Sequence, residues 1–333
     1  MLQGFKNKIK TWSGRNAAVR YAVDRLQQTR FNWLYKKYYT NPESDHTAST
    51  IEINLEFASQ CNLRCKFCAL DHQKPHVQMS EEVLKTLMNT LLNDERFNRV
   101  ERLNLYNGGE TLLHPKRLEM LRFIAAYRVK FIAQGKRFPK VVMLTNGMLL
   151  RPALSDSIIN EHLVDVMKFS LDGGTPEAFE EMRVNAKWNL FYTNVKYFVE
   201  KAKSKGIHSA GITIVPDELP LNTSWMHPEF REIIELLSDY ELRRLHNWGG
   251  AIDIAKKKRW KKGCNMLLDQ MVVLPNGDVT ICCNDLNSLG VTGNILEKSL
   301  FELYQSEERL RHVKLLKQGR KSELFLCADC ETY

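Results

Sequence analysis

Cys61-Asn-Leu-Arg-Cys65-Lys-Phe-Cys68-Ala-Leu70 is the stretch that decides the fold. It places three thiols at C-x3-C-x2-C spacing directly after an apolar run, Ile51–Phe57. Three cysteines on one short loop reach three corners of a cuboidal iron–sulfur cluster and leave the fourth iron free for a substrate or cofactor. The alternatives are a zinc knuckle, with His72 as fourth ligand, or unliganded core thiols. Because the spacing is not the two-by-two pattern of most zinc sites, it favours a cluster with an open site.

The triplet, with the aromatic Phe67 before its last cysteine, resembles the cluster-binding motif of the radical S-adenosylmethionine (SAM) superfamily. The resemblance implies that Cys61, Cys65 and Cys68 bind a 4Fe-4S cluster and that Phe67 lies beside the cofactor. SAM would chelate the fourth iron through its amino and carboxyl groups. It further implies reductive cleavage of SAM to a 5'-deoxyadenosyl radical, which abstracts hydrogen from an unactivated C–H bond. An external electron donor such as flavodoxin or ferredoxin is then expected.

Length and composition fit one large domain and a small one. The 333 residues are 44% apolar and 26% charged, which is enough to bury a substantial core. No stretch reaches the length of a transmembrane helix, and the start, Met1–Lys6, lacks the apolar core of a secretory signal. Eight unevenly spaced cysteines then indicate metal binding in a reducing compartment, the cytoplasm, rather than disulfides. The net charge of +9 favours anionic partners without naming one.

Residues 1–48 form a basic extension that is expected to be helical. Its apolar residues Val19, Val23, Leu26 and Trp33 recur near helical spacing. Such a helix either packs on the main domain or lies peripherally on an anionic membrane surface or acidic partner, with nucleic acid less favoured. Against the single acid Asp24, the cations before residue 40 are Lys6, Lys8, Lys10, Arg15, Arg20, Arg25, Arg30, Lys36 and Lys37. Residues 41–47 read as a linker.

From Ile51 onward the pattern alternates between strands and helices. Strands are expected at 51–57, 100–106, 141–145, 164–170, 210–215 and 242–247. Helices are expected from 80 and at 116–134, 151–160, 175–182, 191–205 and 228–240. This alternation predicts a parallel sheet with helices outside it. Six such units match the α/β fold of the family, a partial (β/α)6 TIM-like barrel over residues 49–255, with site residues at the carboxyl ends of the strands.

Loops at these strand ends carry motifs that the resemblance assigns to SAM. Gly108-Gly109-Glu110 follows the second strand and resembles the Gly-Gly-Glu motif that lines the SAM amino group, with Thr111 where the family often has proline. A lone Gly-Gly-Glu is an ordinary turn, so its place one βα unit after the cysteine loop supports the assignment. The further assignments are the ribose contact Ser170, the loop-shaping Asp172, the SAM-carboxylate partner Arg183 and an additional SAM contact, Asn146. Substrate contacts are expected in the turn His246–Gly250, where Trp248 serves packing or recognition.

The last unit, residues 256–333, contains the other five cysteines. A hairpin is expected from 271–274 and 279–282 around Asn276-Gly277, then a helix at 299–316. Since adjacent strand residues point to opposite faces, only one of Cys282 and Cys283 joins a tetrathiolate site. The natural ligand set is Cys264, Cys282, Cys327 and Cys330. With its string Pro275–Asp285, this unit resembles the small SPASM/twitch domain of radical SAM enzymes, in the shorter form with a second, auxiliary 4Fe-4S cluster; zinc is the rival occupant.

The sequence does not identify the substrate. Twitch relatives include dehydrogenases and epimerases acting on sugars and aminocyclitols, whereas SPASM relatives mostly modify ribosomally made peptides. Many peptide-modifying members carry a leader-binding domain, for which 48 residues are too few. The preferred interpretation is oxidation or epimerisation of a carbohydrate-type or other small anionic substrate. A peptide or protein substrate is the alternative, and a non-enzymatic iron–sulfur or zinc module is the alternative from another class.

Cys283 is a candidate catalytic residue. By resemblance, the residue after this cluster ligand lies near the substrate pocket in some SPASM enzymes. A thiol there either gives a hydrogen atom to a carbon radical, which makes the reaction a redox-neutral inversion, or is a small buried hydrophobe. In the second case the auxiliary cluster accepts the electron and the reaction is an oxidation.

Overall fold

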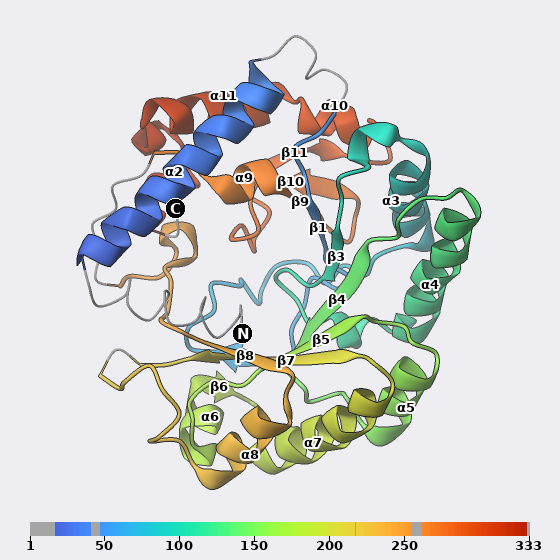
Figure 1. The fold of residues 1–333 in the computed structure, drawn as a ribbon, viewed down its shortest axis with the longest axis vertical. Coiled ribbons are helices and arrows are strands. Elements are labelled where there is room, and N and C mark those ends of the chain that lie inside the picture. The colour runs from blue at the N-terminus through green and yellow to red at the C-terminus, as the bar shows by residue number, and fades with distance from the viewer. Residues whose placement is uncertain (1–16, 41–46, 217, 255–261, 332–333) are drawn as a thin grey trace.

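The computed structural model describes residues 17–40, 47–216, 218–254 and 262–331 (Figure 1). Its centre is a sheet whose six parallel strands run in the order β1-β3-β4-β5-β7-β8. They are β1 (Glu52–Leu55), β3 (Arg102–Leu105), β4 (Lys140–Thr145), β5 (Val166–Ser170), β7 (His208–Ile214) and β8 (Asp239–Arg243). The helices between them, on the outer side of the sheet in Figure 1, are α3 (Glu81–Asn93), α4 (Arg117–Ala133), α5 (Pro152–Asn160), α6 (Pro176–Met182), α7 (Trp188–Ser204) and α8 (Pro228–Leu236). The predicted α/β partial barrel is confirmed.

Strands β1 and β3 have an apolar outer face and a polar inner face. Leu103 and Leu105 of β3 are fully buried in the core formed with the helices. Because side chains alternate along a strand, Asn104 points to the other face. There its amide donates to Glu52 Oε2 at 3.0 Å and to Asn54 Oδ1 at 2.8 Å, both on β1. On these two strands the barrel interior is therefore lined by hydrogen-bonding side chains.

Three predicted elements have wrong boundaries. The helix expected over 228–240 ends at Leu236, because Ser238 N already donates to Ser209 O at 2.9 Å and begins the pairing of β8 with β7. The sixth strand accordingly spans Asp239–Arg243 rather than 242–247. The helix expected over 299–316 is two helices, α10 (Leu300–Tyr304) and α11 (Glu307–Gln318), because the Ser306 hydroxyl caps the second by accepting from Arg309 N at 3.4 Å.

The C-terminal unit extends the barrel sheet. β9 (Gln270–Val273) pairs in parallel with β1 along the whole strand, and β10 (Asp278–Thr280) and β11 (Val291–Asn294) follow antiparallel. The predicted hairpin is present, but β10 ends before the double cysteine. Cys282 and Cys283 lie in a turn in which Asp285 N donates to Cys282 O at 3.1 Å. The strand-alternation argument for these two residues was therefore wrong.

The basic extension contains α2 (Ala17–Tyr39), which lies across the C-terminal unit beside α9 (Asn265–Asp269) and α11 in Figure 1. Phe31, Leu34 and Tyr38 are buried in a second apolar core with residues of α9 and α11. The predicted apolar stripe is wrong in part: Val19 and Val23 are half-buried, but Leu26 is 72% exposed and Trp33 56%. In this half of the helix the face that carries Phe31, Leu34 and Tyr38 is buried instead. Residues 1–16, most of the linker and the basic segment 255–261 lie outside the described residues. No helix in the described ranges combines the length and apolar character needed to cross a membrane.

Candidate active site

The first cysteine loop follows β1 at the carboxyl edge of the sheet and is held from two sides. Its short strand β2 (Arg64–Cys65) pairs antiparallel with β6 (Arg183–Val184), so Cys65 lies opposite Arg183. On the other side Glu110 N donates to Gln60 O at 2.9 Å. Both contacts come from motifs assigned to SAM, so the fold brings the predicted cluster loop and the predicted cofactor residues to one place.

The three thiols of this loop lie close enough to affect one another's ionisation. Burial raises the pKa of Cys61 to about 11, and the charges of Glu110 and Cys65 add to the rise. Burial likewise raises the pKa values of Cys65 and Cys68. Within the described ranges no three His, Cys, Asp or Glu side chains, His72 included, converge on a position for a single metal ion. Three thiols on one loop are the donor set of a cubane cluster, whose binding displaces their protons.

The Gly-Gly-Glu motif fastens the cysteine loop to β4. A Cβ atom on Gly109 would lie 1.8 Å from Ala58 O, so only glycine fits this close backbone approach. The Glu110 carboxylate is buried and accepts hydrogen bonds from Thr145 Oγ1 at 2.9 Å and Asn146 N at 2.8 Å. Gly108 N donates to Glu56 Oε2 at 2.8 Å. The motif thus has a structural role here, and its contact with the SAM amino group stays a prediction.

Asn146 lies against the first cysteine loop. Its amide nitrogen donates to Asn62 Oδ1 at 2.8 Å and is 3.8 Å from Cys61 Sγ, while its oxygen accepts from Met148 N at 3.0 Å. An amide beside a ligand sulfur is one of the levers by which a protein sets the potential of a cluster. The predicted SAM contact of Asn146 stays a prediction.

Asp172 and Arg183 form a buried ion pair behind the same loop. Asp172 also accepts from Ile214 N at 2.7 Å, and Ser170 ends β5 two residues before it. Burial lowers the pKa of Arg183, but the Cys65 and Asp172 charges outweigh this and raise it, so the side chain stays cationic. Its Nε is buried without a hydrogen-bond partner. An orphaned guanidinium N–H beside Cys65 fits the predicted carboxylate of SAM.

The four thiols predicted for the auxiliary site also lie together. Burial raises the pKa of Cys327 far above its usual range, and the neighbouring Cys282, Cys264 and Cys330 raise it further. They come from the start of α9, the turn after β10 and the C-terminal turn, in which Cys330 N donates to Cys327 O at 3.1 Å. The donor set fits the predicted second cluster. Cys283 makes a hydrogen bond with Cys282 and lies beside Tyr106, at the barrel side of this site.

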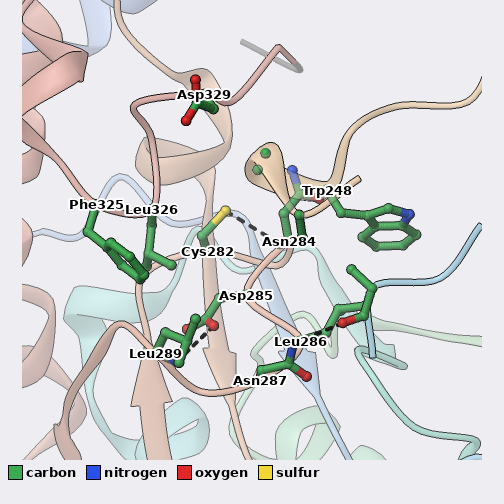
Figure 2. A pocket seen from close by; sticks show the side chains of 14 residues that line it. Trp248, Cys282, Asn284, Asp285, Leu286, Asn287, Leu289, Phe325, Leu326 and Asp329 are labelled. Carbon is green, nitrogen blue, oxygen red and sulfur yellow. Dashed lines mark hydrogen bonds between the residues drawn. The ribbon is translucent and has the colours of Figure 1, made fainter. Parts of the chain in front are cut away.

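A cavity of about 240 Å³ opens against Cys282. In Figure 2 Cys282 lies between the turn that carries Trp248 and the loop that carries Asp329. This turn contacts both cysteine loops: Trp248 Nε1 donates to Phe67 O at 2.8 Å, and Asn247 Nδ2 donates to Asp329 O at 2.6 Å. Phe67 is thus contacted through its carbonyl, and Trp248 has a positioning role.

Sequence reasoning missed a buried ion pair where the two units meet. Lys74 Nζ lies 3.5 Å from Glu56 Oε1. It also donates to Leu286 O, in the segment that follows Cys283, at 2.7 Å. Burial raises the pKa of Glu56, and Lys74 opposes the rise. The signal was available: Glu52, Asn54 and Glu56 alternate with apolar residues in the first strand, which indicates a polar barrel interior.

Known proteins resemble the chain over both units. It is 22% identical to the S-adenosyl-L-methionine-dependent 2-deoxy-scyllo-inosamine dehydrogenase of Niallia circulans, over 84% of this chain and 91% of that protein. It is 26% identical to the GTP 3',8-cyclase of Acaryochloris marina, over 49% of this chain and only 47% of the cyclase.

Solved structures share the fold. BtrN in complex with AdoMet and 2-DOIA superposes with a TM-score of 0.59 at 20% identity, covering 85% of this chain and 93% of BtrN. Streptococcus suis SuiB bound to the precursor peptide SuiA gives a TM-score of 0.62 at 14% identity, covering 84% of this chain and 70% of SuiB.

Family models match the two units separately. Residues 55–220 match the radical SAM superfamily, and residues 264–331 match an iron–sulfur cluster-binding domain named SPASM. The first match begins at the last residue of β1 and spans the cysteine loop and the barrel strands from β3 to β7, and the second spans all four thiols of the auxiliary set. The chain therefore belongs to the radical SAM superfamily and carries a C-terminal SPASM domain.

Proposed function

We propose that this radical SAM enzyme oxidises or epimerises a small polyhydroxylated molecule bound between the barrel and the auxiliary site. The observation that carries the proposal is the extent of similarity to the 2-deoxy-scyllo-inosamine dehydrogenase, which includes 91% of that protein. A second feature supports it. The inner faces of β1 and β3 carry hydrogen-bonding side chains such as Asn54 and Asn104, which suit the hydroxyl groups of a carbohydrate-type substrate.

The residues divide the work between the two cysteine sites. When bound, the first cluster and SAM supply a carbon-centred radical that removes a hydrogen atom from the substrate. Cys61, Cys65 and Cys68 would hold that cluster, with the Arg183 guanidinium orienting the SAM carboxylate. The auxiliary cluster would be held by Cys264, Cys282, Cys327 and Cys330.

Cys283 separates the two chemistries within this proposal. It lies beside Tyr106, the residue that follows β3, so its thiol is on the barrel side of the auxiliary site. If it donates a hydrogen atom, Cys283→Ser abolishes inversion and the incorporation of solvent deuterium at the attacked carbon. If the auxiliary cluster accepts the electron instead, the same variant keeps its product and its rate.

The function is tested on anaerobically reconstituted enzyme with SAM and a reductant. Neutral, amino and acidic sugars, including 2-deoxy-scyllo-inosamine, are supplied with deuterium on carbon, and 5'-deoxyadenosine is analysed by mass spectrometry. Deuterium transfer from one of them supports the proposal. A product three mass units lighter than the deuterated substrate, which has lost the deuterium and one hydrogen, indicates oxidation. A product one mass unit lighter, in which hydrogen has replaced the deuterium, indicates epimerisation. Deuterium transfer from labelled peptides and from none of the sugars would assign the second candidate, peptide modification, which the fold likeness to SuiB bound to its precursor peptide favours.

We also propose two partners for this activity. An external flavodoxin or ferredoxin supplies the electron.

The outer face of α2 lies on an anionic surface, because Leu26 and Trp33 are exposed there and the Lys37 ammonium is 5.2 Å from the Trp33 ring centre. The double variant Leu26→Ser/Trp33→Ser should lose salt-sensitive binding to phosphatidylserine vesicles while keeping SAM cleavage. Unchanged vesicle binding would contradict the second of these proposals.

A further inference from the structure

Arg243, the last residue of β8, differs from the other arginines around the barrel. Arg102 pairs with Glu52, and Arg183 with Asp172. Like that of Arg183, the Nε of Arg243 is buried without a hydrogen bond, but in the described part of the chain Arg243 has no carboxylate partner. A partly buried cation without a counter-charge is unfavourable in the free protein, so its retention at a strand end points to an anion that binds there.

Arg243 shifts the pKa of two groups, Tyr106 and His246, and neither carries a charge at neutral pH. Burial raises the pKa of Tyr106 to about 12 and Cys283 adds to the rise, against the opposing charges of Arg102 and Arg243, so the phenol stays neutral. Burial lowers the pKa of His246 to about 4, and Arg243 lowers it further, so the imidazole is neutral too. These groups come from the loops after β3 and β8 and from the turn after β10. They therefore meet where the barrel faces the auxiliary unit.

We propose that Arg243, with Tyr106 beside it, binds a carboxylate or phosphate group of the substrate next to Cys283. The guanidinium presents paired N–H donors that match either oxyanion, and the neutral phenol adds a further donor. This inference rests on the proposed function and narrows it, because the substrate becomes a polyol bearing an acid group. It also separates this chain from its relative that, by its name, acts on an inosamine.

A charge-selective alkylation of Cys283 tests the site without turnover. In the reconstituted enzyme the clusters cover the seven assigned ligand thiols, which leaves Cys283 to react, and peptide mapping quantifies its modification. Iodoacetate carries a carboxylate and iodoacetamide does not. The ratio of the iodoacetate rate to the iodoacetamide rate therefore reports the electrostatic potential at Cys283, because the fraction of ionised thiol affects both rates equally. We expect this ratio to fall by about three- to tenfold in Arg243→Gln, as for a charge screened by nearby solvent. Inorganic phosphate should slow iodoacetate in the wild type only.

Two controls distinguish a site from a general charge effect. Arg243→Lys should lower the rate ratio only slightly, and Arg137→Gln should leave it unchanged. Arg137 is 70% exposed and lies 3.7 Å from Glu101, and the two residues precede β4 and β3. An unchanged ratio in Arg243→Gln overturns the inference. If Cys283 resists alkylation, thermal unfolding decides: glucuronate should raise the melting temperature of the wild type but not of Arg243→Gln, and equal shifts overturn the inference. Neither readout depends on catalysis, so a failed sugar assay leaves both valid.

Discussion

The first cysteine loop collects its three thiols from eight consecutive residues, Cys61–Cys68, whereas the auxiliary set takes four from three separate segments around Cys264, Cys282 and Cys327–Cys330. The first set is close in sequence whatever the rest of the chain does, because a short loop fixes the reach of its side chains. The second set is brought together by tertiary contacts, since β9 pairs with β1 and α2 packs on α9, which begins after Cys264. The two sites should therefore respond differently to substitutions that loosen the fold.

The largest expected effect tests the independence of the two sites. Replacing Cys61, Cys65 and Cys68 with Ala should abolish 5'-deoxyadenosine formation, because the thiolates that bind the first cluster are gone. Reconstituted wild type should hold about eight iron atoms per chain and the triple variant about four, at four per cubane. Iron analysis with Mössbauer spectroscopy measures both. A triple variant that keeps all its iron would show that the ligand assignment is wrong.

The same contrast explains what could be predicted from sequence. The cluster loop, the Gly-Gly-Glu motif and the parallel strands depend on local patterns, and all were found. The apolar stripe of α2 was misplaced, because Phe31 and Leu34 are buried by α9 and α11, far along the chain. The position of Arg243 at a strand end could not be predicted either, since its strand was set three to four residues too late and its lack of an ion-pair partner depends on what faces it in space.

Gly109→Ala should break the first site and spare the second. The new Cβ would lie 1.8 Å from Ala58 O, and a backbone oxygen cannot move without shifting the loop that begins at Cys61. We expect near-complete loss of SAM cleavage and of the first cluster, with the auxiliary cluster still present by electron paramagnetic resonance. Gly135→Ala is the control: nothing lies within 4 Å of its Cβ, and its φ of 66° costs only about 1–2 kcal/mol. Equal damage in both variants would contradict the close-approach argument.

Phe31→Ala should do the opposite, breaking the auxiliary site and sparing the first site. The ring is 1% exposed and packs against Gly263, where an added Cβ would lie 2.4 Å from it, directly before Cys264. Removing a buried aromatic ring costs about 3–5 kcal/mol of unfolding free energy, here concentrated beside one auxiliary ligand. Thermal unfolding and iron content should show a less stable protein that loses the auxiliary cluster first and still cleaves SAM. Trp33→Ala, on the exposed face of the same helix, should change stability by less than about 0.5 kcal/mol.

The smallest expected effects come from the turn that contacts both loops, and they test whether the sites can be separated at their point of contact. Trp248→Phe keeps most of the ring but removes the 2.8 Å hydrogen bond to Phe67 O, at a cost of about 1 kcal/mol. Asn247→Ala removes the group that donates to Asp329 O and accepts from Glu331 N, and these two residues flank Cys330. If the loops are independent, Trp248→Phe should alter only the resonance signal of the SAM-bound cluster, and Asn247→Ala only that of the auxiliary cluster. Should either variant shift both signals equally, the turn is a rigid bridge, and the two sites must be treated as one assembly despite their different origins in the sequence.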